Sequence, residues 1–231
     1  MMWSWIPQNA AQIRQLTLES AYLGIAPALI GLLISLPLGI ACSRWRWLYA
    51  PVLSATSVLY AVPSLALFIV LIPYTGLTDT TVIIALTLFS FCILVPGVVD
   101  GMRSVPDPVR QAATAMGFGT LRRLVQVELP IALPVVIAGL RVAMVSSISL
   151  ASVGQLIGVS SLGYFIIDGY QRDFPTEIYV GAGLIIVLAL VCDLLLVGLR
   201  RLLTPWRPGR SSGETKTVAP APVPTPMVVA R

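Results

Sequence analysis

Arg141 and Asp193 are charged residues that lie well inside long apolar stretches, and they are the first candidates for chemistry. At a helical rise of about 1.5 Å per residue, they lie roughly 14 Å and 10 Å from the same end of their stretches. An unpaired charge at such a depth in a membrane costs at least about 2.5–3.5 kcal/mol. The similar depths predict a structural ion pair between Arg141 and Asp193. The alternative is that Arg141 lines a path for a transported solute.

The sequence shows no catalytic or metal-binding constellation. It contains no histidine, which is the commonest general base and metal ligand. Cys42, Cys92 and Cys192 lack the spacing of a metal site or a disulfide framework, so we interpret them as small buried hydrophobes. No GxxxxGK[ST] phosphate-binding motif is present. We therefore expect a non-catalytic chain without a metal or cofactor of its own, whose energy comes from another subunit or not at all.

The composition indicates the elements that position these residues. The chain has 231 residues, of which 57% are hydrophobic and 11% charged, whereas a soluble domain averages about 25% charged residues. This composition predicts an all-α, polytopic membrane protein. Five apolar stretches are long enough to cross a hydrocarbon core of roughly 30 Å. They cover about residues 18–42, 52–72, 81–99, 131–153 and 177–199.

The remaining segments flank a transmembrane domain that we place at residues 18–203. Residues 1–17 carry Trp3 and Trp5, which are typical of a membrane interface. Residues 154–176 are mixed in character and are expected to lie on the membrane or to enter it partway. Residues 204–231 are rich in proline and are expected to form a disordered cytoplasmic tail. A ligand for a proline-recognising partner is the alternative reading of this tail.

The distribution of lysine and arginine predicts the orientation. With five crossings and residues 104–130 inside the cell, 12 of these residues lie inside and 2 outside. The two outside are Arg14 and Arg172. Because cytoplasmic loops carry the excess of basic residues, we expect the N-terminus outside and the C-terminus inside the plasma membrane of a prokaryote.

Residues 104–130 form the one long polar and basic interruption between the apolar stretches. They must lie in water, because irregular backbone is not tolerated against lipid. Ser104 and Asp107 fit a capping box at the start of a short helix. That helix is predicted to stop at Gly117, where glycine can take a left-handed conformation. A second helix is expected to end at Pro130. The sequence thus predicts two helices joined by a glycine elbow, which could bind a soluble partner.

Within this segment, Gln111-Ala112-Ala113, Gly117 and Val127-x-Leu129-Pro130 resemble the cytoplasmic "E-A-A, G, I-x-L-P" signature of ATP-binding cassette (ABC) importer permeases. The spacing matches at every anchor. Gln111 replaces the signature glutamate, which removes a charge and any ion pair that it makes with an ATPase, and Val127 replaces the isoleucine conservatively. On this resemblance we assign ATPase coupling to eight residues of the segment: Gln111, Ala112, Ala113, Gly117, Arg122, Glu128, Leu129 and Pro130.

A longer pattern is similar to the permeases of osmoprotectant importers, which take up glycine betaine, choline, carnitine and related compounds. It comprises Met116-Gly117, Val127–Val135, Ala138–Arg141, Pro63–Ala66 and Gly158-x-x-x-x-Gly163. The resemblance covers about residues 18–203. It implies a methionine-importer-like core of about five helices per subunit. It also implies a second permease subunit, identical or homologous, a pair of cytoplasmic ATPases that bind ATP and magnesium, and an external substrate-binding protein.

Tyr60, Pro63 and Ser64 are our candidates for the translocation path, because prolines inside spans free backbone carbonyls. A permease for another small solute, such as an amino acid, is an alternative within the same class. An ion-coupled secondary transporter is an alternative of a different class. It predicts inverted repeats and more acids within the membrane, and the sequence shows no repeat. A purely structural membrane anchor does not explain the ordered 104–130 segment.

Overall fold

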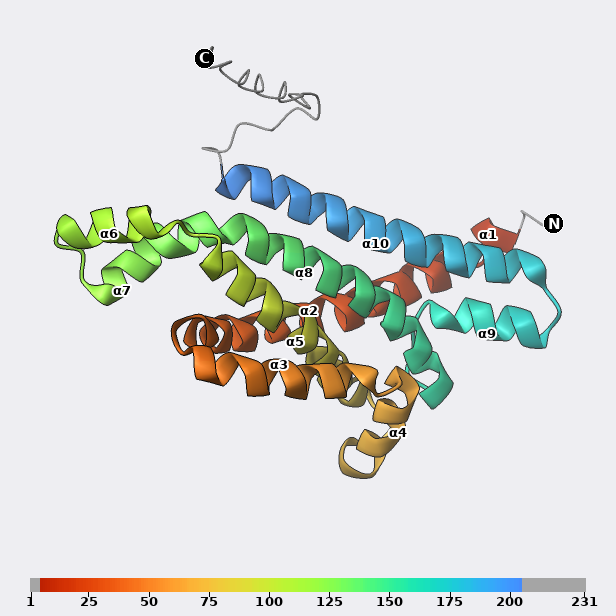
Figure 1. Cartoon of the computed structure of the whole chain (residues 1–231). Coiled ribbons are helices and arrows are strands. Elements are labelled where there is room, and N and C mark those ends of the chain that lie inside the picture. The colour runs from red at the N-terminus through yellow and green to blue at the C-terminus, as the bar shows by residue number, and fades with distance from the viewer. Residues whose placement is uncertain (1–4, 205–231) are drawn as a thin grey trace, which may run out of the picture.

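The computed structural model describes residues 5–204, and all regular structure within them is helical. Figure 1 shows long helices lying side by side, with shorter helices at both ends of the bundle. The elements in chain order are α1 (Trp5–Gln8), α2 (Ala10–Arg44), α3 (Arg46–Ala61), α4 (Ser64–Thr75), α5 (Asp79–Arg103), α6 (Asp107–Ala115), α7 (Thr120–Arg123), the π-helical turn η1 (Leu124–Glu128), α8 (Leu129–Ala151), the 3-10 helix η2 (Ser152–Ile157), α9 (Gly163–Gln171) and α10 (Pro175–Leu203).

Within residues 5–204, four helical stretches are long and apolar enough to cross a membrane, and a bent pair makes a fifth when it is counted as one span. The four are α2, α5, the continuous stretch Thr120–Ile157, and α10. The predicted all-helical membrane protein with about five spans is confirmed. The helices extend further than the apolar runs indicated: α2 starts at Ala10, so the boundary that we predicted at residue 17 falls inside this helix.

The apolar stretch that we predicted over residues 52–72 is not one continuous helix. The chain bends by 94° between α3 and α4. Val62, which lies at the bend, has an extended backbone with φ −71° and ψ 127°. Pro63 causes this, because its ring excludes the preceding residue from the helical region and it has no amide hydrogen to donate. In Figure 1, α4 turns away from the direction of α3.

The core lies where α2, α5 and α8 pack against one another. Buried aliphatic and small side chains fill it, including Ala28, Leu94, Ala143 and Ile148. Small residues bring the backbones close: a Cβ added at Gly97 would lie 3.6 Å from the Cα of Gly139. The Gly97-x-x-x-Gly101 pattern therefore serves packing within this chain.

No helix within residues 158–176 is long enough to cross a membrane. Helix α9 has nine residues, and at about 1.5 Å per residue it is roughly 14 Å long, far short of a hydrocarbon core. It packs on α10 and η2, at the end of the bundle opposite α6 and α7 (Figure 1). The ring of Trp5 lies 5.5 Å from that of Phe165, which fastens α1 to α9. Of the predicted tail, residues 205–231 lie outside the described residues, as does Trp3.

We expect Gly163→Ala to destabilise the protein strongly. An added Cβ at Gly163 would overlap the backbone carbonyl of Ser152, which cannot rotate away. Overpacking of this kind costs typically about 1–3 kcal/mol. Thermal unfolding of the purified protein in detergent measures the effect. Gly183→Ala is the matched control, because nothing lies within 4 Å of a Cβ built there. An equal change in melting temperature for both variants would contradict the prediction.

Candidate functional site

The start of α6 differs from the predicted capping box. Pro106 is the N-cap residue, and no side chain caps the helix. Ser104 instead closes α5: its hydroxyl donates to the carbonyl of Gly101 at 2.7 Å, and its amide bonds to the carbonyls of Asp100 and Gly101. Because these hydrogen bonds hold Ser104 at the end of α5, its side chain does not cap the first turn of α6. Asp107 and Pro108 occupy that first turn, where their types are favourable.

The predicted glycine elbow is confirmed in its geometry. Gly117 has φ +81°, and nothing lies within 4 Å of a Cβ built there. The amide of Phe118 donates to the carbonyl of Ala113 at 3.1 Å, which closes the end of α6. Glycine is therefore needed here for its backbone conformation rather than for space. The chain then starts α7 at Thr120.

The second helix does not end at Pro130, contrary to the prediction. It continues from α7 through η1 into α8, as one stretch from Thr120 to Ile157. Within η1, the amide of Leu129 donates to the carbonyl of Leu124, five residues back. A wider turn relieves the contact between a proline ring and the carbonyl four residues before it. The π-helical turn thus lets Pro130 sit in the second position of α8 without breaking the helix.

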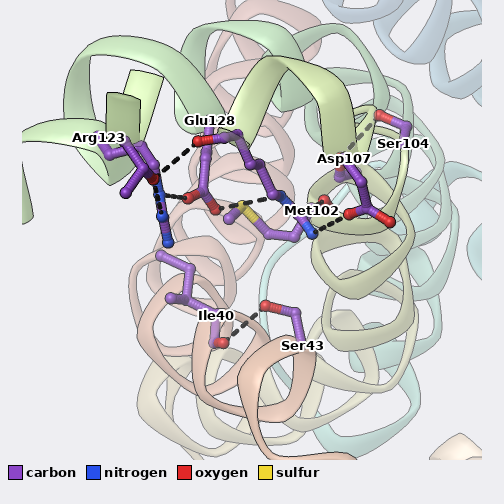
Figure 2. A network of polar contacts seen from close by, with 10 residues as sticks. Ile40, Ser43, Met102, Ser104, Asp107, Arg123 and Glu128 are labelled. Carbon is purple, nitrogen blue, oxygen red and sulfur yellow. Dashed lines mark hydrogen bonds and ion pairs between the residues drawn. The ribbon is translucent and has the colours of Figure 1, made fainter. Parts of the chain in front are cut away.

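Glu128 is the buried centre of an ionic network that holds the 104–130 segment together. Its side chain is 5% exposed. The Nε of Arg123, on α7, donates to its Oε1 at 2.8 Å. The Nε of Arg110, on α6, lies 3.8 Å from its Oε2. Figure 2 shows Arg123 and Glu128 facing each other. One carboxylate therefore joins α6 and α7 to the start of the membrane helix α8.

Two further contacts extend this network. Arg110 donates from Nη2 to the carbonyl of Met102 at 2.5 Å, near the end of α5. Arg123 donates from Nη1 to the hydroxyl of Thr114 at 2.8 Å. The outer ion pair of Arg110 with Asp107 is longer, at 3.4 Å, and Asp107 is 81% exposed. The network thus reaches both membrane helices that flank the segment, α5 and α8.

The segment exposes three large apolar side chains among its polar ones. Met116, Leu121 and Val125 are 70%, 73% and 54% exposed. The segment also forms a groove of about 350 Å³, which is lined by Arg110, Gln111, Thr114, Ala115 and Arg123. In Figure 1, α6 and α7 extend beyond the end of the helix bundle. Such a surface can bind a partner of complementary shape.

The eight predicted coupling residues differ in their exposure. Gln111, Ala112 and Gly117 are exposed, whereas Ala113 and Glu128 are buried, and Arg122, Leu129 and Pro130 lie elsewhere on the segment. Arg122 stacks over the ring of Phe118 at 4.6 Å and donates to Gln126 at 3.0 Å, away from Glu128. The sequence did not identify Arg110 and Arg123 as partners of Glu128. In an ordinary α-helix, side chains three or four residues apart are neighbours, so the five-residue spacing of Arg123 and Glu128 does not predict an ion pair.

Arg141 and Asp193 form a two-pronged ion pair between α8 and α10. The Nε of Arg141 donates to Oδ1 of Asp193 at 2.6 Å, and its Nη2 donates to Oδ2 at 2.7 Å. The planar guanidinium matches both carboxylate oxygens, which makes such pairs strong and directional. The geometry favours a role in joining the two helices.

A charge-swapped pair tests this structural role. Arg141→Asp or Asp193→Arg alone should strongly reduce the amount of protein in the membrane, because each places two like charges side by side. The double variant should restore at least part of that amount. Membrane expression measured by quantitative blotting gives the result. No recovery in the double variant, with both single variants depleted, would argue that Arg141 has another role.

The three predicted path residues lie at the bend between α3 and α4. Tyr60 is 58% exposed and its ring lies edge to face with that of Phe89, at 6.1 Å. Pro63 and Ser64 follow at the bend itself. Tyr60, but neither Pro63 nor Ser64, lines a groove between α3 and α5.

The comparisons with known proteins agree with this fold. Residues 31–207 match the family described as binding-protein-dependent transport system inner membrane component. The osmoprotectant import permease protein OsmW of Salmonella typhimurium is 33% identical over 85% of this chain and 94% of its own length. The choline transport system permease protein OpuBD of Bacillus subtilis is 34% identical over 85% of this chain and 86% of its own length.

Solved structures support the same architecture. The chain is similar to one of the MetNI methionine ABC transporter in an inward-facing conformation, with a TM-score of 0.71 and 20% identity, covering 83% of this chain and 96% of that one. At this identity the likeness concerns the fold, and the methionine-importer-like core is confirmed. Taken with the match over residues 31–207, these findings show that the chain belongs to the binding-protein-dependent transport system inner membrane component family.

Proposed function

We propose that this chain is the permease subunit of an ATP-driven importer for small osmoprotectants such as glycine betaine, choline or carnitine. The observation that carries the proposal is the 104–130 segment, a folded element that extends beyond the membrane helices and is tied to them through Glu128. The solute class is supported by relatives at 30% identity or more that are named for osmoprotectant, choline and carnitine transport.

The proposed assembly contains three kinds of contact. A pair of cytoplasmic ATPases, which bind ATP and magnesium, binds the exposed side of α6 and α7. A second permease, identical or homologous, completes the pore, and an external binding protein delivers the solute to the opposite end. The excess of basic residues inside supports an N-terminus outside and a C-terminus inside.

The proposed mechanism is alternating access driven by the ATPases. When they close, they push on α6 and α7. The Glu128 network transmits this displacement to α5 and α8, because its contacts reach the start of α8 and the end of α5. The tilt of these helices opens the path, in which we place Tyr60, Pro63 and Ser64, to one side of the membrane and then to the other.

The amino-acid alternative receives less support. The solved amino-acid and methionine transporters share only 17–20% identity with this chain, and that likeness concerns the fold alone. The ion-coupled alternative is not favoured, because the family is one of binding-protein-dependent transport systems.

Uptake by cells tests the proposal. A strain that lacks this gene should lose uptake of labelled glycine betaine or choline in high-salt medium, and the restored gene should return it. Labelled methionine serves as the comparison solute. If methionine uptake depends on the gene while uptake of betaine, choline and carnitine does not, the amino-acid alternative replaces the proposal.

A further inference from the structure

A second groove, also of about 350 Å³, lies between α3 and α5. It shares no lining residue with the groove of the 104–130 segment. Its volume falls in the range of small-molecule sites, roughly 300–1,000 Å³. Every residue that lines it is uncharged. The residues used below are Thr56, Ser57 and Tyr60 of α3, and Cys92 and Pro96 of α5.

The hydroxyl groups of the groove are available as acceptors. Thr56 donates its hydroxyl hydrogen to the carbonyl of Leu53 at 2.9 Å, and Ser57 donates to the same carbonyl at 2.8 Å. A hydroxyl has one hydrogen and two lone pairs. Because each hydrogen is used within α3, the oxygen atoms of Thr56 and Ser57 can only accept further hydrogen bonds.

Helix α5 adds to this acceptor character. Pro96 has no amide hydrogen, so it cannot donate to the carbonyl of Cys92, four residues before it. The thiol of Cys92 donates to the carbonyl of Leu88 at 3.2 Å, and its hydrogen is also used. Of the groups considered in this groove, the Tyr60 hydroxyl is the one with a hydrogen to give. Oxygen dipoles without matching donors favour a positive charge over a negative one.

One exposed face of α3 carries a row of hydroxyl groups. Ser54, Ser57 and Tyr60 recur every third residue and are all exposed in this chain. Residues three apart share one face of a helix, so they form a polar stripe along a segment that contributes to a membrane span. Polar residues within membrane spans normally face a bundle interior or a water-filled cavity.

We propose that this groove is a solute subsite that binds the methylated ammonium group of the transported osmoprotectant, with Tyr60 as its aromatic wall. This inference rests on the proposed function. A quaternary ammonium group carries a positive charge, has no hydrogen to donate, and is held by aromatic rings. An inorganic divalent cation would need carboxylates, which the groove lacks. An anion would need donors, which the groove has in short supply.

Thiol labelling tests whether water-soluble reagents reach the groove and whether choline binds there. Ser57→Cys is made in a chain whose Cys42, Cys92 and Cys192 are replaced by alanine, and the whole transporter is reconstituted in vesicles. We expect a charged methanethiosulfonate reagent to label Ser57→Cys, and choline to slow the labelling at least about threefold. Proline at the same concentration should not slow it. Val58→Cys, which lies beside the groove, is the matched control and should show no choline effect.

Replacement of Tyr60 in the natural background gives an independent test. Tyr60→Leu should lower choline uptake by about tenfold, in keeping with the loss of a cation–aromatic contact. Tyr60→Phe, which keeps the ring, should remain within about twofold of the wild type. ATP hydrolysis stimulated by the loaded binding protein should persist in both variants. Tyr74→Leu is the matched control, because Tyr74 is exposed at the end of α4 and does not line the groove.

The outcomes separate this inference from the proposed function. If the wild type does not transport any osmoprotectant, the proposed function fails. If the wild type transports choline but Ser57→Cys resists labelling, the groove is covered by lipid or by the second permease and the inference is wrong. It is also wrong if choline gives no protection, or if Tyr60→Leu transports like Tyr74→Leu.

Discussion

Glu128→Ala should nearly abolish solute uptake while the protein still reaches the membrane. The change removes the carboxylate that both Arg110 and Arg123 contact, and it leaves Arg123 without an acidic partner and Arg110 with only the exposed Asp107. Breaking a buried ion pair by removing one partner costs about 3–5 kcal/mol. Because 1.4 kcal/mol corresponds to a factor of ten, we expect uptake to fall by at least about tenfold.

The measurements are uptake and ATP hydrolysis of the reconstituted transporter. In Glu128→Ala, hydrolysis should no longer rise when the loaded binding protein is added, because movement of the ATPases is no longer tied to α5 and α8. Asp107→Asn is the matched control: it also removes a carboxylate bonded to Arg110, but Asp107 is 81% exposed. Exposed pairs contribute about 0–1 kcal/mol, so uptake should stay within about twofold. Normal uptake by Glu128→Ala would show that the network is not required for coupling.

Gly117→Val should detach the ATPase from the permease. Valine at a φ of +81° is strongly disfavoured, because its branched side chain clashes with its own backbone. The elbow must then open, and the exposed Met116 and Leu121 on either side of it lose their relative positions. We expect the amount of ATPase that co-purifies with the permease to fall by roughly tenfold, in line with a strain of about 1–3 kcal/mol.

Two variants separate backbone strain from side-chain bulk. Gly119→Val adds the same side chain two residues away, where φ is −63° and a Cβ meets nothing within 4 Å. It should keep the ATPase. Gly117→Asn should keep most of it, because asparagine tolerates the left-handed conformation. Equal losses in Gly117→Val and Gly119→Val would point to bulk at the interface instead of the elbow geometry.

Much of the fold follows from composition alone. A long apolar stretch has few alternatives to a membrane helix, since every backbone polar group must be satisfied within it. The break at Pro63 could be anticipated from residue type, but its 94° angle could not. That angle depends on where α4 packs, and Phe68 of α4 is fully buried in a cluster with Val82, Leu86 and Ile157. These partners come from distant parts of the chain.

The sequence predicted the two helices and the glycine elbow of the candidate site, but not the ion pairs that join them. Gly117 could be identified because glycine is the residue that most readily adopts the left-handed conformation at the end of a helix. The role of Glu128 as the joint between α6 and α8 could not be identified, because Arg110 lies 18 positions earlier and Arg123 reaches it across a π-helical turn. A periodic pattern of 3.6 residues places Arg123 and Glu128 on different sides of a helix.

The sequence by itself predicted which segments form long apolar helices, where the glycine elbow lies, and that Arg141 pairs with Asp193. In each case burial in lipid or a positive φ leaves few alternatives, so residue type and depth are sufficient. Only the tertiary structure decided that Pro130 continues a helix, that Ser104 closes α5, and that one buried carboxylate joins two helices. Those outcomes depend on groups brought together by packing, whose separation along the chain carries no information about their distance in space.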